Sequence, residues 1–391
     1  MTEYNIPIAK TQLTSDEISS VLEPLKSGWL VQGPKVGEFE EKWCQFTNAK
    51  HSIAVTSCTS ALHLSLEALD FGEGDEAIVP AFTWISTANV VEHLRGKVVF
   101  CDIDLNTFNL DVSKIEELIT PSTKVIIPVH LFGLPANMEP ILSIAKAHNL
   151  KVVEDAACGF GSQYRGRHVG LFGDTGCFSF HPRKSITTGE GGMITTENDE
   201  LAKKLRCLRD HGAELSDLQR HVGPRPYLLA DHPLAGYNQR MTDIQGVLGS
   251  TQMDRAGKIL EERRQLASNY NDAFVTLEWL RTPTPTPDLI HGYQSYPCLF
   301  APQKIDLKSV ADINLKRNSW MEKLQSIGIS TRPATHAVHM LSYYKNKYGL
   351  KPSDYPNSYI ANDCSVSFPL YNGMTSSEQN FVIDAISGAT F

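Results

Sequence analysis

Between residues 52 and 155 the chain alternates short apolar runs, rich in β-branched residues, with amphipathic segments. The apolar runs are Ile53–Thr56, Ala77–Val79, Val98–Cys101, Val125–Val129 and Val152–Glu154. Helix-like segments lie between or near them, at 60–70, 85–95, 111–119 and 138–148. Strands that are apolar throughout and separated by helices are typical of a parallel sheet covered on both faces. The sequence therefore predicts an α/β fold with a large, mostly parallel sheet.

The rest of the chain predicts further elements and a second, smaller domain. We expect an opening helix, two more strands, a long irregular stretch from Glu214 to Leu234, and an α+β C-terminal part. The predicted elements are helix 14–26, strands Cys177–His181 and Met193–Thr196, helices 199–210, 250–278, 307–326 and 375–389, and strands 293–300, 329–332 and 365–368. At about 150 residues per domain, a chain of 391 residues is expected to form two domains. We place a large domain with an N-terminal arm at 1–250 and the smaller domain at 251–391.

Composition limits the class of protein. The net charge of −8 disfavours non-specific nucleic-acid binding, which needs a basic face. Eight scattered cysteines without a CxxC pair indicate reduced thiols, with neither a disulfide frame nor a zinc site. The N-terminus lacks the pattern of a signal peptide, and no apolar run approaches about 18 residues. A cytoplasmic enzyme without a bound metal and without a membrane partner is the expectation.

The stretch SFHPRKSITTGEGG, residues 179–192, places a lysine where a strand passes into a Gly-rich loop. Lysine is the residue that forms Schiff bases with carbonyl compounds, so Lys184 is a candidate catalytic amine. The alternative is an ordinary surface lysine before a flexible loop.

In VVEDAACGFGS, residues 152–162, an apolar strand ends on Glu154 and Asp155. Ligands of open α/β sheets lie beyond the carboxyl ends of the strands, so Asp155 is expected to point into a crevice. A carboxylate there could pair with a protonated pyridine nitrogen. The alternative is a helix-capping role. Glu154 is one residue out of phase and is expected to face away.

Two further segments follow predicted strands. In VTSCTSALHLSLEAL, residues 55–69, hydroxyl side chains stand at the start of a helix, which suits a phosphate but also suits simple capping. In PAFTWISTAN, residues 80–89, Trp84 could stack on a cofactor ring or could be a core or interface tryptophan.

Taken together, these segments resemble the DegT/StrS family of nucleotide-sugar aminotransferases, which use pyridoxal 5′-phosphate (PLP). The resemblance covers nearly the whole chain. It is carried in order by SGWLVQGPKV (27–36), the segments quoted above, VIIPVHLFGLPANM (125–138), VEDAACGFGSQYRGRHVGLFGD (153–174), AGYNQRMTDIQ (235–245), GISTRPATHAVHMLSYY (328–344) and SVSFPLYNGMT (365–375).

The resemblance implies a type I aminotransferase fold and a homodimer with active sites shared between subunits. Lys184 then matches the Schiff-base lysine and Asp155 the partner of the pyridine nitrogen. The remaining matches are Trp84 for ring stacking, Thr59, Ser60 and Ser179 for the phosphate, Asn238 as a residue lent by the neighbouring subunit, and Trp29, His181, Arg183 and His339 near the substrate.

Two positions depart from the family pattern. Cys58 stands where glycine is usual, which puts the backbone geometry of the phosphate turn in doubt. Cys158 stands beside the cofactor where Gln, His or Glu is usual, and a thiol is a weak hydrogen-bond partner.

The resemblance implies amino transfer from glutamate to a nucleotide-linked keto-sugar, with pyridoxamine 5′-phosphate (PMP) as the intermediate cofactor form. Relatives that dehydrate their substrate carry histidine in place of the lysine, so Lys184 favours amination. The chain is most similar to members that aminate C4, such as the perosamine synthases and the UDP-4-keto-pentose aminotransferase of lipid A modification. This implies a role in lipopolysaccharide, O-antigen or another surface polysaccharide that contains a dideoxyamino sugar.

Several alternatives stay open at this point. They are amination at C3, a PLP-dependent dehydratase, an aminotransferase for cyclitols or for a cyclic precursor of an aromatic amine, a non-catalytic sensor of PLP or sugar nucleotide, and a scaffold protein. The nucleotide, UDP, GDP or dTDP, is not fixed by the sequence.

Overall fold

The computed structural model describes residues 5–215, 227 and 229–391. Its centre is a seven-stranded sheet with the order β1-β10-β9-β6-β5-β2-β4. All neighbouring strands are parallel except β10, which is antiparallel to both β1 and β9. The strands are β1 (His51–Val55), β2 (Glu76–Pro80), β4 (Lys97–Cys101), β5 (Thr123–Ile126), β6 (Lys151–Asp155), β9 (Thr175–Ser179) and β10 (Gly192–Thr196). The predicted mostly parallel sheet is confirmed.

Alternate side chains of each strand enter different cores. Ile53 and Val55 pack with the helices on one face, whereas Ala54 packs on the other. The first face is covered by α4 (Cys58–Ala68), α5 (Ser86–His93) and α7 (Asp199–Arg209), and the second by α3 (Pro34–Thr47) and α6 (Met138–Ala147). Burial on both faces explains why the strands are apolar throughout.

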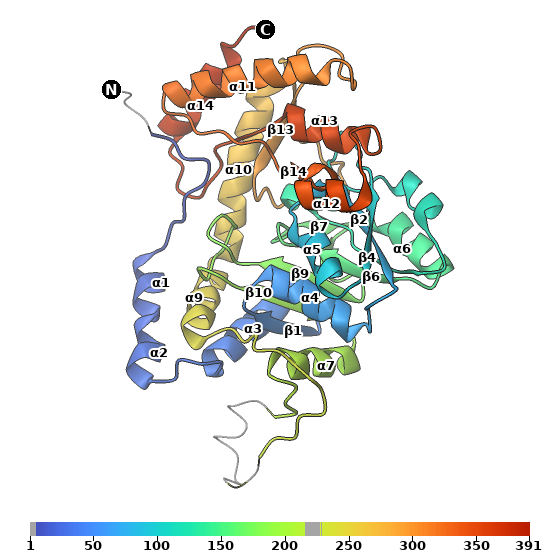
Figure 1. Cartoon of the computed structure of the whole chain (residues 1–391). Helices are drawn as coiled ribbons and strands as arrows, with labels where there is room; N and C mark the ends of the chain where they lie inside the picture. The colour runs from blue at the N-terminus through green and yellow to red at the C-terminus, as the bar shows by residue number, and fades with distance from the viewer. Residues whose placement is uncertain (1–4, 216–226, 228) are drawn as a thin grey trace.

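The C-terminal part has a core of its own. Three antiparallel strands in the order β11-β13-β15 pack with four helices around aromatic residues that include Tyr270, Phe300 and Trp320. The elements are α10 (Ala256–Phe274), β11 (Leu280–Arg281), β13 (Tyr296–Phe300), α11 (Val310–Ser326), α13 (Pro356–Cys364), β15 (Ser365–Phe368) and α14 (Ser376–Ser387). Figure 1 shows α10 running from the large sheet to these elements.

Short elements complete the described fold. They are α1 (Ser15–Ser20), α2 (Leu22–Ser27), β3 (Phe82–Thr83), β7 (Gln163–Tyr164), β8 (Arg167–His168), α9 (Asp243–Met253), β12 (Leu289–Ile290), β14 (His336–Ala337), α12 (Ser342–Tyr348), and the 3₁₀ turns η1 (Val112–Lys114), η2 (Glu116–Leu118), η3 (Leu131–Gly133) and η4 (Val338–Met340).

Three predicted helices differ from the structure. The helix expected at 14–26 is two helices, because Pro24 has no N–H to donate to Ser20 and its ring crowds that carbonyl. The helix expected at 250–278 is α9 and α10, which meet at a break around Arg255. The segment 111–119 forms η1 and η2 in place of an α-helix.

Other differences lie in elements that depend on tertiary contacts. The strand expected at 329–332 is wrong: Ile329 and Arg332 make only isolated bridges, to Ile6 and Ser367. The helices α3, α12 and α13 were not anticipated. Much of the irregular stretch from Glu214 to Leu234 lies outside the described residues.

The division into domains at residue 250 stays a prediction, and α9 runs across that position. All eight cysteines are free, as expected. Within the described ranges, none of the helices combines the length and apolarity needed to cross a bilayer.

Candidate active site

Several of the predicted residues lie at one edge of the large sheet. Asp155 is the last residue of β6 and Ser179 the last of β9. The strand β1 runs parallel to both and ends just before Ser57, which caps α4. The carboxyl ends of parallel strands meet at the same sheet edge, so these groups face one region of the molecule.

Lys184 lies in the loop between β9 and β10, where its N–H donates to the carbonyl of His181 at 2.8 Å. Its Nζ lies 3.2 Å from Sγ of Cys158, in a small cavity that both residues line together with Ser179. Burial acts to lower the pKa of Lys184, but Cys158, Cys58 and Asp155 outweigh burial and raise it. The protonated form of the amine is therefore stabilised by the thiols of Cys158 and Cys58 and by the carboxylate of Asp155.

Asp155 is buried at 4 % exposure. Its Oδ2 accepts a hydrogen bond from Thr87 Oγ1 at 2.7 Å, and its Oδ1 accepts one from the N–H of Ala157 at 3.1 Å. Burial raises the pKa of Asp155, while these two hydrogen bonds and the charge of Lys184 act to lower it. The carboxylate is electrostatically coupled to the lysine without contacting it directly.

Glu154 serves a different purpose from its neighbour. It is fully buried and accepts hydrogen bonds from the N–H groups of Gly170, Phe172 and Gly173, and it pairs with His130 Nε2 at 2.8 Å. Glu154 therefore anchors the loop before β9, which agrees with the expectation that it faces away from the site.

The start of α4 presents a cluster of hydroxyl groups. Ser60 Oγ lies 2.8 Å from Thr56 Oγ1 and 3.0 Å from Ser57 Oγ, and Thr59 Oγ1 donates to Ser86 Oγ at 3.0 Å. Hydroxyls and free N–H groups at a helix N-terminus suit an anion. Cys58 is the first residue of α4, and its backbone does not have a positive φ. A cysteine in place of glycine therefore causes no backbone strain at this position.

Trp84 is 57 % exposed, which excludes the core alternative. Its ring centroid lies 5.6 Å from that of His336, whose strand β14 pairs with β3. His339, in contrast, is fully buried against Tyr355, and burial lowers its pKa to about 4. His336, which sequence analysis did not select, is therefore the exposed histidine beside Trp84.

Four further predicted residues, Trp29, His181, Arg183 and Asn238, are absent from the lining of the Lys184 cavity. Trp29 donates from Nε1 to the carbonyl of Gln32 at 3.3 Å. His181 Nδ1 accepts from the N–H of Arg183 at 3.2 Å, and burial lowers the pKa of His181. Asn238 is exposed and bridges to Asp210 through its backbone, away from any contact with Lys184 in the same chain.

Comparison with known proteins identifies the family. The model of the DegT/DnrJ/EryC1/StrS aminotransferase family matches residues 11–387. The chain belongs to this family. As a DegT/DnrJ/EryC1/StrS aminotransferase, it is a PLP-dependent enzyme of the sugar aminotransferase group, with the predicted type I aminotransferase fold.

Individual relatives of this aminotransferase match it over nearly their whole length. It is 38% identical to the protein MJ1066 of Methanocaldococcus jannaschii, over 98% of this chain and 97% of that protein. It is 37% identical to the spore coat polysaccharide biosynthesis protein SpsC of Bacillus subtilis, over 98% and 95%. Spr1654 of Streptococcus pneumoniae, provisionally described as a sugar aminotransferase and solved in its PMP form, superposes with a TM-score of 0.89 at 29% identity, over 98% of each chain.

The residues of this aminotransferase fit PLP. Ser185 Oγ is buried beside Lys184 and has no hydrogen-bond partner among the described residues, which leaves a polar group for a ligand. A Cβ on Gly192 would lie 2.4 Å from the backbone of Ser57, so β10 closes tightly on the start of α4. Sequence analysis missed Thr87, Ser86 and Ser185, because hydroxyl residues in helices and loops carry no distinctive pattern.

Proposed function

We propose that this aminotransferase transfers the amino group of glutamate to a nucleotide-linked keto-sugar, at C4, in the synthesis of an amino sugar for a surface polysaccharide. The observation that carries the proposal is the half-buried Lys184, whose Nζ lies 3.2 Å from Cys158 Sγ and whose pKa is raised in part by the carboxylate of Asp155. The similarity to SpsC, a spore coat polysaccharide biosynthesis protein, supports the polysaccharide context.

When bound, PLP supplies an aldehyde that bonds to amines and a ring that delocalises the charge left on carbon after a proton leaves. In this proposal Lys184 holds the cofactor and then, as a free amine, takes the proton from Cα of glutamate. Proton transfer by a positioned side chain contributes about 10²–10⁴-fold to the rate. Asp155 keeps a proton on the ring nitrogen, and Thr87 and Ala157 hold the carboxylate in place.

The phosphate would lie among Thr59, Ser60 and Ser179, and Trp84 would cover one face of the ring. Cys158 holds Lys184 through its thiol, where relatives place a more polar group. Trp29, His181, Arg183 and His339 remain candidates for substrate contacts, and exposed His336 joins them.

We propose a homodimer in which Asn238 of one subunit completes the site of the other. An exposed apolar surface along α1, α2 and the turn after them supports this arrangement. Its members are Ile18, Leu22, Leu25, Leu30 and Val31, exposed between 44% and 60%. An apolar surface of this kind on a folded protein is typical of a subunit interface.

The test is an assay of the PLP-loaded enzyme with glutamate and a panel of UDP-, GDP- and dTDP-linked 4-keto and 3-keto sugars. We expect 2-oxoglutarate release with a 4-keto-sugar and an amino sugar product identified by mass and NMR. Product from 3-keto-sugars alone would move the reaction to C3. Loss of water from the sugar without amine transfer would make the enzyme a dehydratase. Turnover only with keto-cyclitols would make it a cyclitol aminotransferase. The absence of any turnover would favour a non-catalytic sensor.

A further inference from the structure

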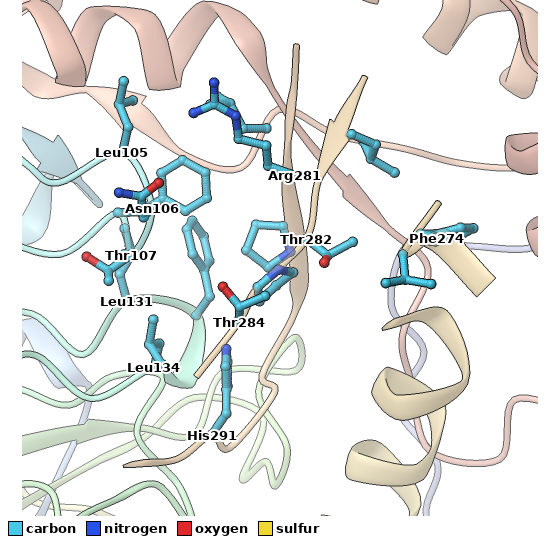
Figure 2. Close-up of a pocket in the computed structure, with 17 residues that line it drawn as sticks. Leu105, Asn106, Thr107, Leu131, Leu134, Phe274, Arg281, Thr282, Thr284 and His291 are labelled. Carbon is cyan, nitrogen blue, oxygen red and sulfur yellow. The ribbon is translucent and has the colours of Figure 1, made fainter. Parts of the chain in front are cut away.

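A second cavity, of about 350 Å³, lies apart from the one that holds Lys184. Its walls come from the loop 105–108, the turn η3 and the segment 280–284 that follows α10. Figure 2 shows the side chains of these segments converging on it. This volume lies in the range of small-molecule sites, which are about 300–1,000 Å³.

The apolar wall of this cavity is fixed before any ligand arrives. Asn109, 4 % exposed, accepts from the N–H of Leu131 through Oδ1 and donates to the carbonyl of Leu134 through Nδ2, both at 3.0 Å. Phe108 and Phe132 have φ values of 59° and 60°, a left-handed conformation that bulky residues rarely adopt. Such strain persists where the surrounding structure imposes it, and it clusters at functional sites.

His291 gives the cavity a hydrogen-bond donor. The residue is 3 % exposed, and its Nδ1 accepts from the N–H of Tyr293 at 2.8 Å. Burial lowers its pKa to about 3, so at neutral pH the single ring proton is on Nε2. Nε2 has no hydrogen-bond partner in the part of the chain that the structure describes, and Figure 2 shows the ring pointing into the cavity. A polar group that lines a cavity in this way can fix the orientation of a ligand by donating to its acceptor atom.

Arg281 gives the cavity a free cation. Its side chain is exposed, and within the described ranges its guanidinium pairs with no carboxylate. In Figure 2 Arg281 and His291 lie at opposite ends of the cavity, with Thr282 and Thr284 between them. The cavity thus combines a charge at Arg281, a donor at His291 and an apolar lining that includes Phe108 and Phe132.

We infer that this cavity binds an elongated small acid, with its anionic group at Arg281, a flat apolar body against Phe108 and Phe132, and an acceptor oxygen at Nε2 of His291. The site is distinct from the amino-transfer site. Gln294, which lines the cavity of Lys184, donates its N–H to the carbonyl of Phe132 at 3.0 Å, so the chain from 291 to 294 forms the wall between the two.

The test is calorimetric titration of the PLP-loaded enzyme with 4-methoxybenzoate, which has the three features in this order. We expect millimolar or tighter binding. The uncharged 4-methoxybenzamide and the acceptor-free 4-ethylbenzoate should each bind about tenfold more weakly, as expected for loss of one charged or buried hydrogen bond.

Two variants test whether 4-methoxybenzoate binds at Arg281 and His291. Arg281→Gln should weaken 4-methoxybenzoate about tenfold and remove the difference between the acid and the amide. His291→Asn keeps an acceptor near the N–H of Tyr293 but loses Nε2, and should remove the difference between the methoxy and ethyl compounds. Arg95→Gln, whose parent side chain is 80% exposed outside the cavity, is the matched control and should leave binding unchanged.

If His291→Asn does not fold, the exposed Arg281→Gln variant carries the test alone. Equal affinity of wild type and Arg281→Gln for 4-methoxybenzoate would overturn the inference. Competition between the probe and glutamate would assign the binding to Lys184, and the absence of binding at millimolar concentration would also refute the second site.

Discussion

At the scale of single residues, the proposed chemistry depends on the amine of Lys184 and the carboxylate of Asp155. Lys184 is stabilised by Cys158 and Asp155, and Asp155 is held by Thr87 and Ala157. Because these groups affect each other's ionisation, a change in one is expected to alter both binding and turnover.

Lys184→Ala should reduce amino transfer by about 10³-fold or more, because among the described residues no other amine lines the cavity to move the proton. PMP should still bind, since it attaches without a lysine. Release of 2-oxoglutarate measures turnover, and a fluorescence titration measures PMP affinity. Lys323→Ala, at an exposed position of α11, is the control. Wild-type turnover in Lys184→Ala would remove this residue from the mechanism.

Asp155→Asn should lose about 10²-fold or more in turnover, since the neutral amide cannot hold the proton on the ring nitrogen.

The cofactor-free Asp155→Asn variant should be more stable than wild type at neutral pH. The pKa of Asp155 is raised by burial, so folding favours the protonated form, and wild-type stability is lost as pH rises from 3.8 through the raised pKa.

Thermal unfolding of both cofactor-free proteins between pH 4 and pH 7 checks the second expectation. The difference in Tm should grow with pH, because the amide has no charge to bury. A difference that stays constant across this range would mean that the ionisation of Asp155 does not affect stability.

At the scale of elements, one side chain joins two helices. Asp243, 1 % exposed at the start of α9, accepts hydrogen bonds from the N–H groups of Gly33, Lys35 and Val36 at the start of α3. A Cβ on Gly33 would lie 1.9 Å from Nε1 of Trp29, so this junction also fixes the segment that carries Trp29. The capping of α3 is thus tied to a candidate substrate residue.

Asp243→Ala should lower the free energy of unfolding by about 2–3 kcal/mol, because it leaves buried N–H groups without acceptors. Denaturant titration measures the loss. Asp254→Ala is the matched control: that side chain is 62% exposed and pairs with Lys42 at 2.7 Å, so its removal should cost less than about 1 kcal/mol. Equal losses in the two variants would show that Asp243 does not cap α3.

At the scale of the whole molecule, the proposed dimer predicts complementation between two inactive variants. If Asn238 acts across the interface, a mixed dimer of Lys184→Ala and Asn238→Asp contains one site with both native residues. Mixing equal amounts, with unfolding and refolding together, should restore about a quarter of wild-type activity, since half the dimers are mixed and each has one native site.

Size-exclusion chromatography of the same samples checks that dimers form. No recovery of activity in verified mixed dimers would assign Asn238 to its own subunit. Each variant refolded alone is the control for residual activity.

The sequence by itself determined the central sheet and most of its strands. Burial on both faces requires short apolar runs rich in β-branched residues, such as Ile53–Val55, and such runs can be recognised in the sequence. It also selected Asp155, which ends a strand, and Lys184, which follows one, because ligands of such sheets lie at the carboxyl ends of the strands. The family resemblance supplied the roles that spacing alone left open.

Only the tertiary structure decided which histidine stands beside Trp84, because His336 and His339 are three residues apart and their burial depends on the pairing of β14 with β3. It likewise decided that Ile329 makes one bridge and no strand, and that Arg281 and His291 face one cavity. These outcomes rest on contacts between segments far apart in the chain, and a local pattern of residues does not record such contacts.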